Sequence, residues 1–74
     1  KDPKTLLQEI LQARRLPLPH YALVATHGEA HVQEFEVECR LSTLGICVSG
    51  QGASRRAAEQ AAARATIDQM AEKK

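Results

Sequence analysis

Residues 50–63 constrain the fold of this 74-residue chain more than any other stretch. Two glycines lead into Ser54, whose hydroxyl suits the N-cap of a helix because it accepts a hydrogen bond from a free backbone N–H. Small residues then recur at every fourth position, which lets the helix lie close to a neighbouring element: Ala58, Ala62 and Thr66. We therefore expect a helix that starts at Ser54 and continues to about Glu72.

The first turn of this expected helix carries two arginines, Arg55 and Arg56. Their position is unfavourable in isolation, because the positive end of the helix dipole repels cations. A polyanion resolves the conflict, since phosphate groups suit both the free N–H groups and the guanidinium side chains. We interpret Ser54, Arg55 and Arg56 as a contact with the backbone of a nucleic acid.

The first residues predict a second helix with two distinct faces. Asp2 followed by Pro3 is typical of an N-cap and a first helical position, and the helix should run to about Arg14 or Arg15, before two prolines. One face is an apolar stripe: Leu7, Ile10 and Leu11. The other face is polar and mostly uncharged: Thr5, Gln8, Glu9 and Gln12.

The middle of the chain alternates with a period of two, which indicates strands. The first strand begins at His20, ends near the turn signal at His27-Gly28, and has inward-facing Tyr21, Leu23 and Ala25. The second has an apolar face, Phe35, Val37, Cys39 and Leu41, and a charged face, Glu34, Glu36, Glu38 and Arg40. A turn near Ser42–Gly45 precedes a third strand, Ile46 to Ser49. We expect an α+β fold of order α-β-β-β-α, with two helices on one face of a three-stranded antiparallel sheet.

Composition limits what this single small domain can do. A chain of 74 residues buries only a thin core and has no room for a deep active-site cleft. Its net charge of +1 means that nucleic-acid binding must depend on locally clustered charge. No apolar run spans a membrane, and the first residues carry no secretion signal and no Met. We expect a cytoplasmic fragment of a longer protein.

The two cysteines, Cys39 and Cys47, fit no zinc-binding spacing. We expect reduced, mostly buried thiols, with a disulfide between neighbouring strands as the alternative.

Residues 50–63 also resemble the C-terminal signature of the double-stranded-RNA-binding domain, as Gly50-x-Gly52-x-Ser54-Arg55-Arg56-x-Ala58-x-x-x-Ala62-Ala63. The pair Glu59-Gln60 makes the stretch more similar to the version at the end of bacterial ribonuclease III. The resemblance covers nearly all 74 residues and implies the same α-β-β-β-α fold. It departs from the wider family at Glu29, where Pro is common, and at Glu59, where a third basic residue is common.

The resemblance also implies a set of RNA-binding residues. The polar face of the first helix enters one minor groove, with Thr5, Gln8, Glu9 and Gln12. The loop Gly28–His31 enters the next minor groove, with His31 on ribose hydroxyls. Ser54, Arg55 and Arg56 span the major groove between them, and Gln60 reaches a phosphate.

The function implied by the resemblance is shape-dependent binding of double-stranded RNA across roughly 16 base pairs, with 2′-hydroxyls distinguishing RNA from DNA. The parent would be a homodimeric, Mg²⁺-dependent endoribonuclease active in RNA processing, including rRNA processing, with its catalytic carboxylates in an absent N-terminal domain. The fragment alone, a monomer without a cofactor or membrane contact, should bind but not cut. The alternatives are a non-catalytic RNA-binding adaptor or protein-interaction module of the same fold, and a small metal-binding or redox protein.

Other chemistries find little support in the sequence. The two glycines lack the rest of a dinucleotide fingerprint or a P-loop. The spacing of His20, His27 and His31 does not suit a metal site, and Glu34, Glu36 and Glu38 form an open row without a pocket that would shift their pKa values. Stacking of single-stranded bases needs surface aromatics, whereas Tyr21 and Phe35 alternate inward. We expect neither catalytic nor metal-binding residues in this chain.

Overall fold

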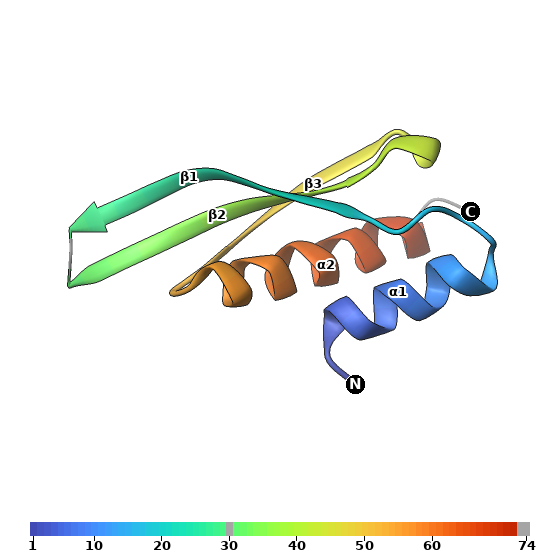
Figure 1. Cartoon of the computed structure of the whole chain (residues 1–74), viewed down its shortest axis with the longest axis horizontal. Helices are drawn as coiled ribbons and strands as arrows, with labels where there is room; N and C mark the ends of the chain where they lie inside the picture. Colours follow the sequence, from blue (N-terminus) through green and yellow to red (C-terminus); the bar gives the residue numbers. More distant parts are fainter. Residues whose placement is uncertain (30, 73–74) are drawn as a thin grey trace.

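The structure is a computed structural model that describes residues 1–29 and 31–72, so that Ala30 of the expected Gly28–His31 loop lies outside the described residues. Its elements are α1 (Pro3–Ala13), β1 (His20–Glu29), β2 (Val32–Leu41), a short 3-10 helix η1 (Ser42–Leu44), β3 (Ile46–Gly52) and α2 (Arg55–Glu72). The sheet is antiparallel in the order β1-β2-β3, and both helices lie on one of its faces (Figure 1). The expected α+β fold is confirmed.

Both ends of α1 have a local cause. At its start, Asp2 Oδ1 accepts a hydrogen bond of 2.8 Å from the backbone N–H of Thr5, as expected of an N-cap. The helix ends at Ala13, slightly earlier than predicted, because Arg15 adopts a left-handed backbone with φ of 57°. The next N–H, of Leu16, then donates to Leu11 O at 2.8 Å, which closes the last turn.

The alternation in β2 is confirmed, since Val37, Cys39 and Leu41 are buried. The alternation predicted for β1 is only half correct. Leu23 lies opposite Val37, but the register shifts before Ala25, which lies opposite Glu36. This β-bulge inserts one residue and reverses the faces beyond it, so that Ala25 shares the charged face of β2.

β3 extends to Gly52, three residues beyond the predicted end at Ser49. The two glycines belong to the strand because Gly50 pairs with Val37 and Gly52 with Phe35 of β2. Both positions are glycine because the backbone of the strand touches α2 there. A Cβ at Gly50 would lie 2.2 Å from the backbone nitrogen of Ala62, and one at Gly52 would lie 2.6 Å from that of Ala58. Any larger residue at these positions forces the strand and the helix apart.

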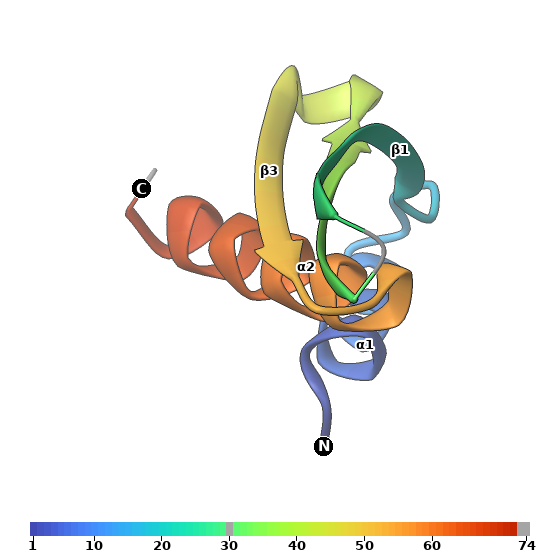
Figure 2. The ribbon, with the colours of Figure 1, turned by 90° about the vertical axis from the view of Figure 1, so that its left-hand side faces the viewer.

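The core lies between the sheet and α2, and α1 packs along α2 (Figures 1 and 2). The predicted small stripe of α2 is confirmed: Ala58, Ala62 and Thr66 are fully buried. The Thr66 hydroxyl donates to Ala62 O at 2.8 Å, so this buried polar group is satisfied within its own helix. The remaining core members are the following apolar residues: Leu7, Leu11, Val37, Cys39, Leu41, Ile46, Ala63 and Met70.

The cysteines have different environments, and both are free. Cys39 is buried, but Cys47 is exposed, so the prediction of two mostly buried thiols was wrong for Cys47. Cys39 lies opposite Val48 and Cys47 lies opposite Arg40, which puts the two thiols on opposite faces of the sheet. A disulfide between them does not fit this register.

The molecule is elongated, with extents of 41 × 24 × 20 Å, and the β1–β2 hairpin forms one end of it (Figure 1). β1 and β2 pair as far as Glu29 and Val32, whereas the pairing of β3 with β2 begins at Phe35. The outer part of the hairpin is therefore a two-stranded ribbon. Within residues 1–29 and 31–72, neither helix has the length and apolar character that a membrane crossing requires.

Candidate nucleic-acid interface

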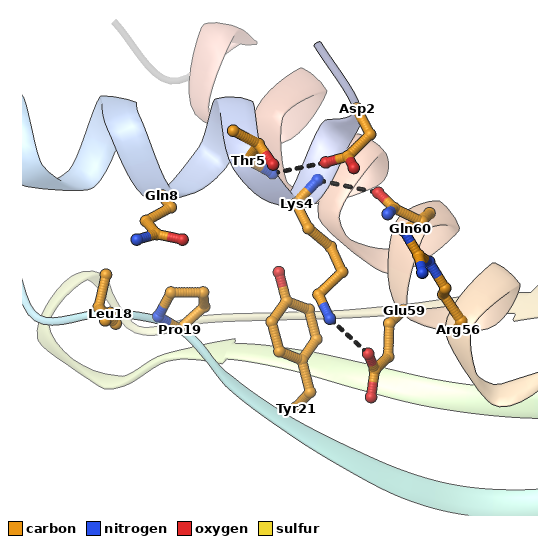
Figure 3. A pocket seen from close by; sticks show the side chains of 10 residues that line it. All are labelled: Asp2, Lys4, Thr5, Gln8, Leu18, Pro19, Tyr21, Arg56, Glu59 and Gln60. Carbon is orange, nitrogen blue, oxygen red and sulfur yellow. Dashed lines mark hydrogen bonds and ion pairs between the residues drawn. The ribbon is translucent and has the colours of Figure 1, made fainter.

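An open cleft of about 520 Å³ lies where α1, α2 and the start of β1 meet (Figure 3). Four of the residues predicted to bind RNA line it: Thr5, Gln8, Arg56 and Gln60. Sequence reasoning had not assigned the other lining residues to the site: Asp2, Lys4, Leu18, Pro19, Tyr21 and Glu59. The fold thus brings part of the polar face of α1 and part of the start of α2 into one surface.

The polar face of α1 is exposed at all four predicted positions, Thr5, Gln8, Glu9 and Gln12. Glu9 Oε2 forms an ion pair with Lys1 Nζ at 2.7 Å, and the side chains of Glu9 and Lys1 are 46% and 61% exposed, respectively. Ion pairs this exposed contribute little, so the Glu9 carboxylate remains accessible to a ligand. Beside this face, the N–H of Thr5 holds the pKa of the Asp2 carboxyl below its ordinary value.

The start of α2 combines a confirmed cap with exposed positive charge. Ser54 Oγ accepts from the N–H of Ala57 at 3.1 Å, as an N-cap does. Arg55 and Arg56 are both exposed, and the first turn holds no acidic residue. In the part of the chain that the structure describes, Arg56 forms no ion pair of 4 Å or less, unlike Arg55. The helix dipole and the Arg56 guanidinium therefore present uncompensated positive charge to solvent.

Lys4 connects the two helices at the cleft. Its ammonium lies 2.6 Å from Glu59 Oε1, and its backbone N–H donates to Gln60 Oε1 at 3.0 Å. Glu59 also contacts Arg55 Nε at 3.3 Å, and the hydrogen bond from Lys4 keeps the pKa of Glu59 below its usual value. Lys4 and Glu59 are 55 residues apart, and no local pattern in the sequence pairs them.

His31 does not line the cleft. It is exposed in the connection between β1 and β2, at the end of the long axis. Viewed from the hairpin end of the molecule, the start of α2 lies between the β1–β2 hairpin and α1 (Figure 2). The side view shows the same order of hairpin, start of α2 and α1 (Figure 1). The three predicted regions follow one another along the molecule, and the individual RNA contacts remain predictions.

The acidic row of β2 is arranged for ion pairing. Glu36 lies 3.3 Å from His27 Nε2, and Glu38 lies 2.7 Å from Arg40. The hydrogen bond from Arg40 lowers the pKa of Glu38, the opposite of what a general acid requires. Within residues 1–29 and 31–72, no three His, Cys, Asp or Glu side chains are grouped so as to hold a metal ion.

The model of the family described as the double-stranded RNA binding motif matches residues 3–70 of the chain. The chain belongs to this family. The domain is 62% identical over 69 residues to Ribonuclease 3 of Ralstonia nicotianae, covering 93% of the domain and 27% of that protein. It is 56% identical over 70 residues to Ribonuclease 3 of Aromatoleum aromaticum, covering 95% of the domain and 31% of that protein. The domain thus spans less than a third of these relatives.

A solved structure of Arabidopsis HYL1, described in connection with miRNA processing, has the same fold. It superposes on the double-stranded RNA-binding domain with a TM-score of 0.77 and 34% identity, covering 93% of this chain and 96% of that one. The fold and the sequence comparisons therefore agree, and the chain is a double-stranded-RNA-binding domain homologous to part of Ribonuclease 3.

Proposed function

We propose that the domain binds duplex RNA by shape, through two successive minor grooves and the phosphates between them, over roughly 16 base pairs. α1 enters one minor groove with its exposed polar face: Thr5, Gln8, Glu9 and Gln12. His31 enters the next minor groove, at the hairpin end of the molecule. Ser54, Arg55 and Arg56 bind the phosphates that lie between these grooves.

The observation that supports this proposal most is the shared cleft of α1 and α2. Gln8 and Thr5 offer neutral donors and acceptors, which suit the ribose hydroxyls of an A-form minor groove. Arg56 lines the same cleft and offers a guanidinium, which suits a phosphate. A duplex lying over this cleft therefore meets both chemistries at adjacent positions.

A salt titration separates the two kinds of contact. Changing Arg55 and Arg56 to Ala should weaken binding to all duplex RNAs similarly and reduce the salt slope by roughly one per lost phosphate contact. Arg64→Ala is the matched control, because Arg64 is exposed on the same helix and pairs with Asp68 at 3.6 Å. An unchanged slope in the double variant would remove these arginines from the interface.

Gln8→Ala should weaken binding without changing the salt slope, because an amide in the minor groove displaces no counterion from phosphate. Gln51→Ala serves as its control, since Gln51 is exposed and lies opposite Glu36 on the charged face of the sheet. Duplex DNA and single-stranded RNA should bind more weakly than duplex RNA to the unaltered domain. Equal affinity for all three nucleic acids would contradict recognition of an A-form minor groove.

We further infer that the domain is the substrate-binding part of a homodimeric, cytoplasmic endoribonuclease that hydrolyses phosphodiester bonds in double-stranded RNA, including rRNA precursors. Identities of 56% and 62% to Ribonuclease 3 proteins favour such a parent over a non-catalytic adaptor. The Mg²⁺ that such cleavage requires would be held by the catalytic domain of the parent.

The isolated domain should run as a monomer in light scattering and leave duplex RNA intact in the presence of Mg²⁺. The parent protein should cleave the same RNA. A parent that binds the duplex but never cleaves it would favour the adaptor.

A further inference from the structure

Glu59 is an acidic residue on a surface that otherwise suits an anionic ligand. Along α2, Glu59 follows Arg55 and Arg56 and directly precedes Gln60, and its side chain lines the cleft. Placed beside phosphates, an unpaired carboxylate would repel the RNA. The contacts of Glu59 show a different use for its charge.

The Glu59 carboxylate holds Lys4 of α1. Lys4 Nζ lies 2.6 Å from Glu59 Oε1 and 5.1 Å from the centroid of the Tyr21 ring, while the backbone N–H of Lys4 donates to Gln60 Oε1 (Figure 3). Two consecutive residues of α2 therefore fix both the main chain and the ammonium of one residue of α1. The arrangement links α1, α2 and β1 at a single point.

The Lys4–Glu59 ion pair is better protected from solvent than the Lys1–Glu9 ion pair. The side chains of Lys4 and Glu59 are 35% and 16% exposed, whereas those of Lys1 and Glu9 are 61% and 46% exposed. Protection from water reduces screening and strengthens the attraction between charges. Because α1 packs mainly along α2, a contact between these two helices contributes to the placement of α1, together with the buried Leu7 and Leu11.

We propose that Glu59 is a positioning residue, which holds α1 through Lys4 so that Thr5 and Gln8 lie at a fixed place relative to Arg56. Gln60 supports the same contact through the Lys4 N–H. Glu59 itself does not bind the RNA, and the Lys4 ammonium pairs with the Glu59 carboxylate rather than with a phosphate. This inference rests on the proposed interface, since it concerns the relative placement of its two parts.

The test uses the variant Lys4→Met with Glu59→Gln, which removes the ion pair without changing the net charge. We expect faster amide hydrogen exchange in α1 of the free domain, and about fivefold weaker binding to duplex RNA with an unchanged salt slope. The matched control is Arg64→Gln with Asp68→Asn, which removes an exposed pair from α2 and should leave α1 exchange and RNA affinity unchanged. Lys4→Arg keeps the cation and should behave like the unaltered domain.

Three results would overturn the proposal. Unchanged α1 exchange in the Lys4→Met, Glu59→Gln variant would show that the pair does not hold α1, whether or not the domain binds RNA. Faster exchange with unchanged RNA affinity would show that the placement of α1 does not matter for binding. Tighter binding in Glu59→Gln alone, with α1 exchange unchanged, would show that Glu59 merely repels the ligand.

Discussion

The contact between β3 and α2 makes a quantitative prediction for Gly50→Ala. The added methyl group would meet the backbone nitrogen of Ala62 at 2.2 Å and the carbonyl carbon of Ala61 at 2.6 Å. Neither atom can move by a side-chain rotation, so the strand or the whole helix must shift. Overpacking of this kind costs about 1–3 kcal/mol, and the upper end applies because the obstacle is backbone.

A stabilising effect opposes this loss. Ala restricts the unfolded chain more than Gly does, which favours folding by about 0.4–1 kcal/mol. The free energy of unfolding of Gly50→Ala should therefore fall by about 2 kcal/mol, which in a domain this small lowers Tm by about 8–16 °C. Far-UV circular dichroism during thermal and urea unfolding measures both quantities.

Gly45→Ala is the control for this substitution. An added Cβ there meets no atom of the described residues within 4 Å, but the backbone is left-handed, with φ of 65°. Its loss arises from backbone strain alone and should be about 1 kcal/mol. If Gly50→Ala unfolds at the same urea concentration as the unaltered domain, β3 and α2 do not pack as closely as the structure shows.

Acidification and thiol labelling test two other features. Asp2 and Glu59 accept hydrogen bonds as carboxylates, so their pKa values in the folded domain lie below the ordinary 3.8 and 4.5, respectively. The stability that these contacts contribute is therefore fully present above the ordinary pKa values and is lost as pH falls through the lower, folded-state pKa values. Urea unfolding at a series of pH values should show stability decreasing below about pH 4.5, and an increase there would contradict these contacts. Cys47 is exposed and should react with iodoacetamide in the folded domain, whereas Cys39, whose thiol pKa burial raises, should react only on unfolding. Equal rates in a peptide-resolved mass measurement would contradict their placement on opposite faces of the sheet.

The elements with a strong local pattern could be predicted from the sequence. Asp2-Pro3 and Ser54 are both found at helix starts, and the small residues of α2 are buried as their spacing predicts. Local patterns were misleading where tertiary contacts decide the backbone. The sequence predicts that the third strand ends at Ser49, whereas the strand continues through Gly50, which pairs with Val37 and must be glycine because α2 passes against it.

Non-local features of the candidate site could not be predicted for the same reason. The bulge between Leu23 and Ala25 lies in a continuous apolar run, Ala22–Ala25, with no glycine to indicate it. The ion pair of Lys4 with Glu59 depends on the docking of two helices from opposite ends of the chain. The polar face of α1 was recognisable because its residues are neighbours on a single helix.

The two-stranded outer part of the β1–β2 hairpin has a consequence for the RNAs that this domain accepts. α1 and α2 share a core, whereas among the described residues between Phe35 and the turn, β2 pairs with β1 and not with β3. A two-stranded ribbon without a third strand is only marginally stable by itself, so its position relative to the core is weakly fixed. A natural stem with mismatches or a bulged nucleotide changes the distance and angle between successive grooves. In the proposed interface, the hairpin would follow that change while α1 keeps its place. We expect the domain to tolerate imperfect stems at its hairpin end better than at its α1 end.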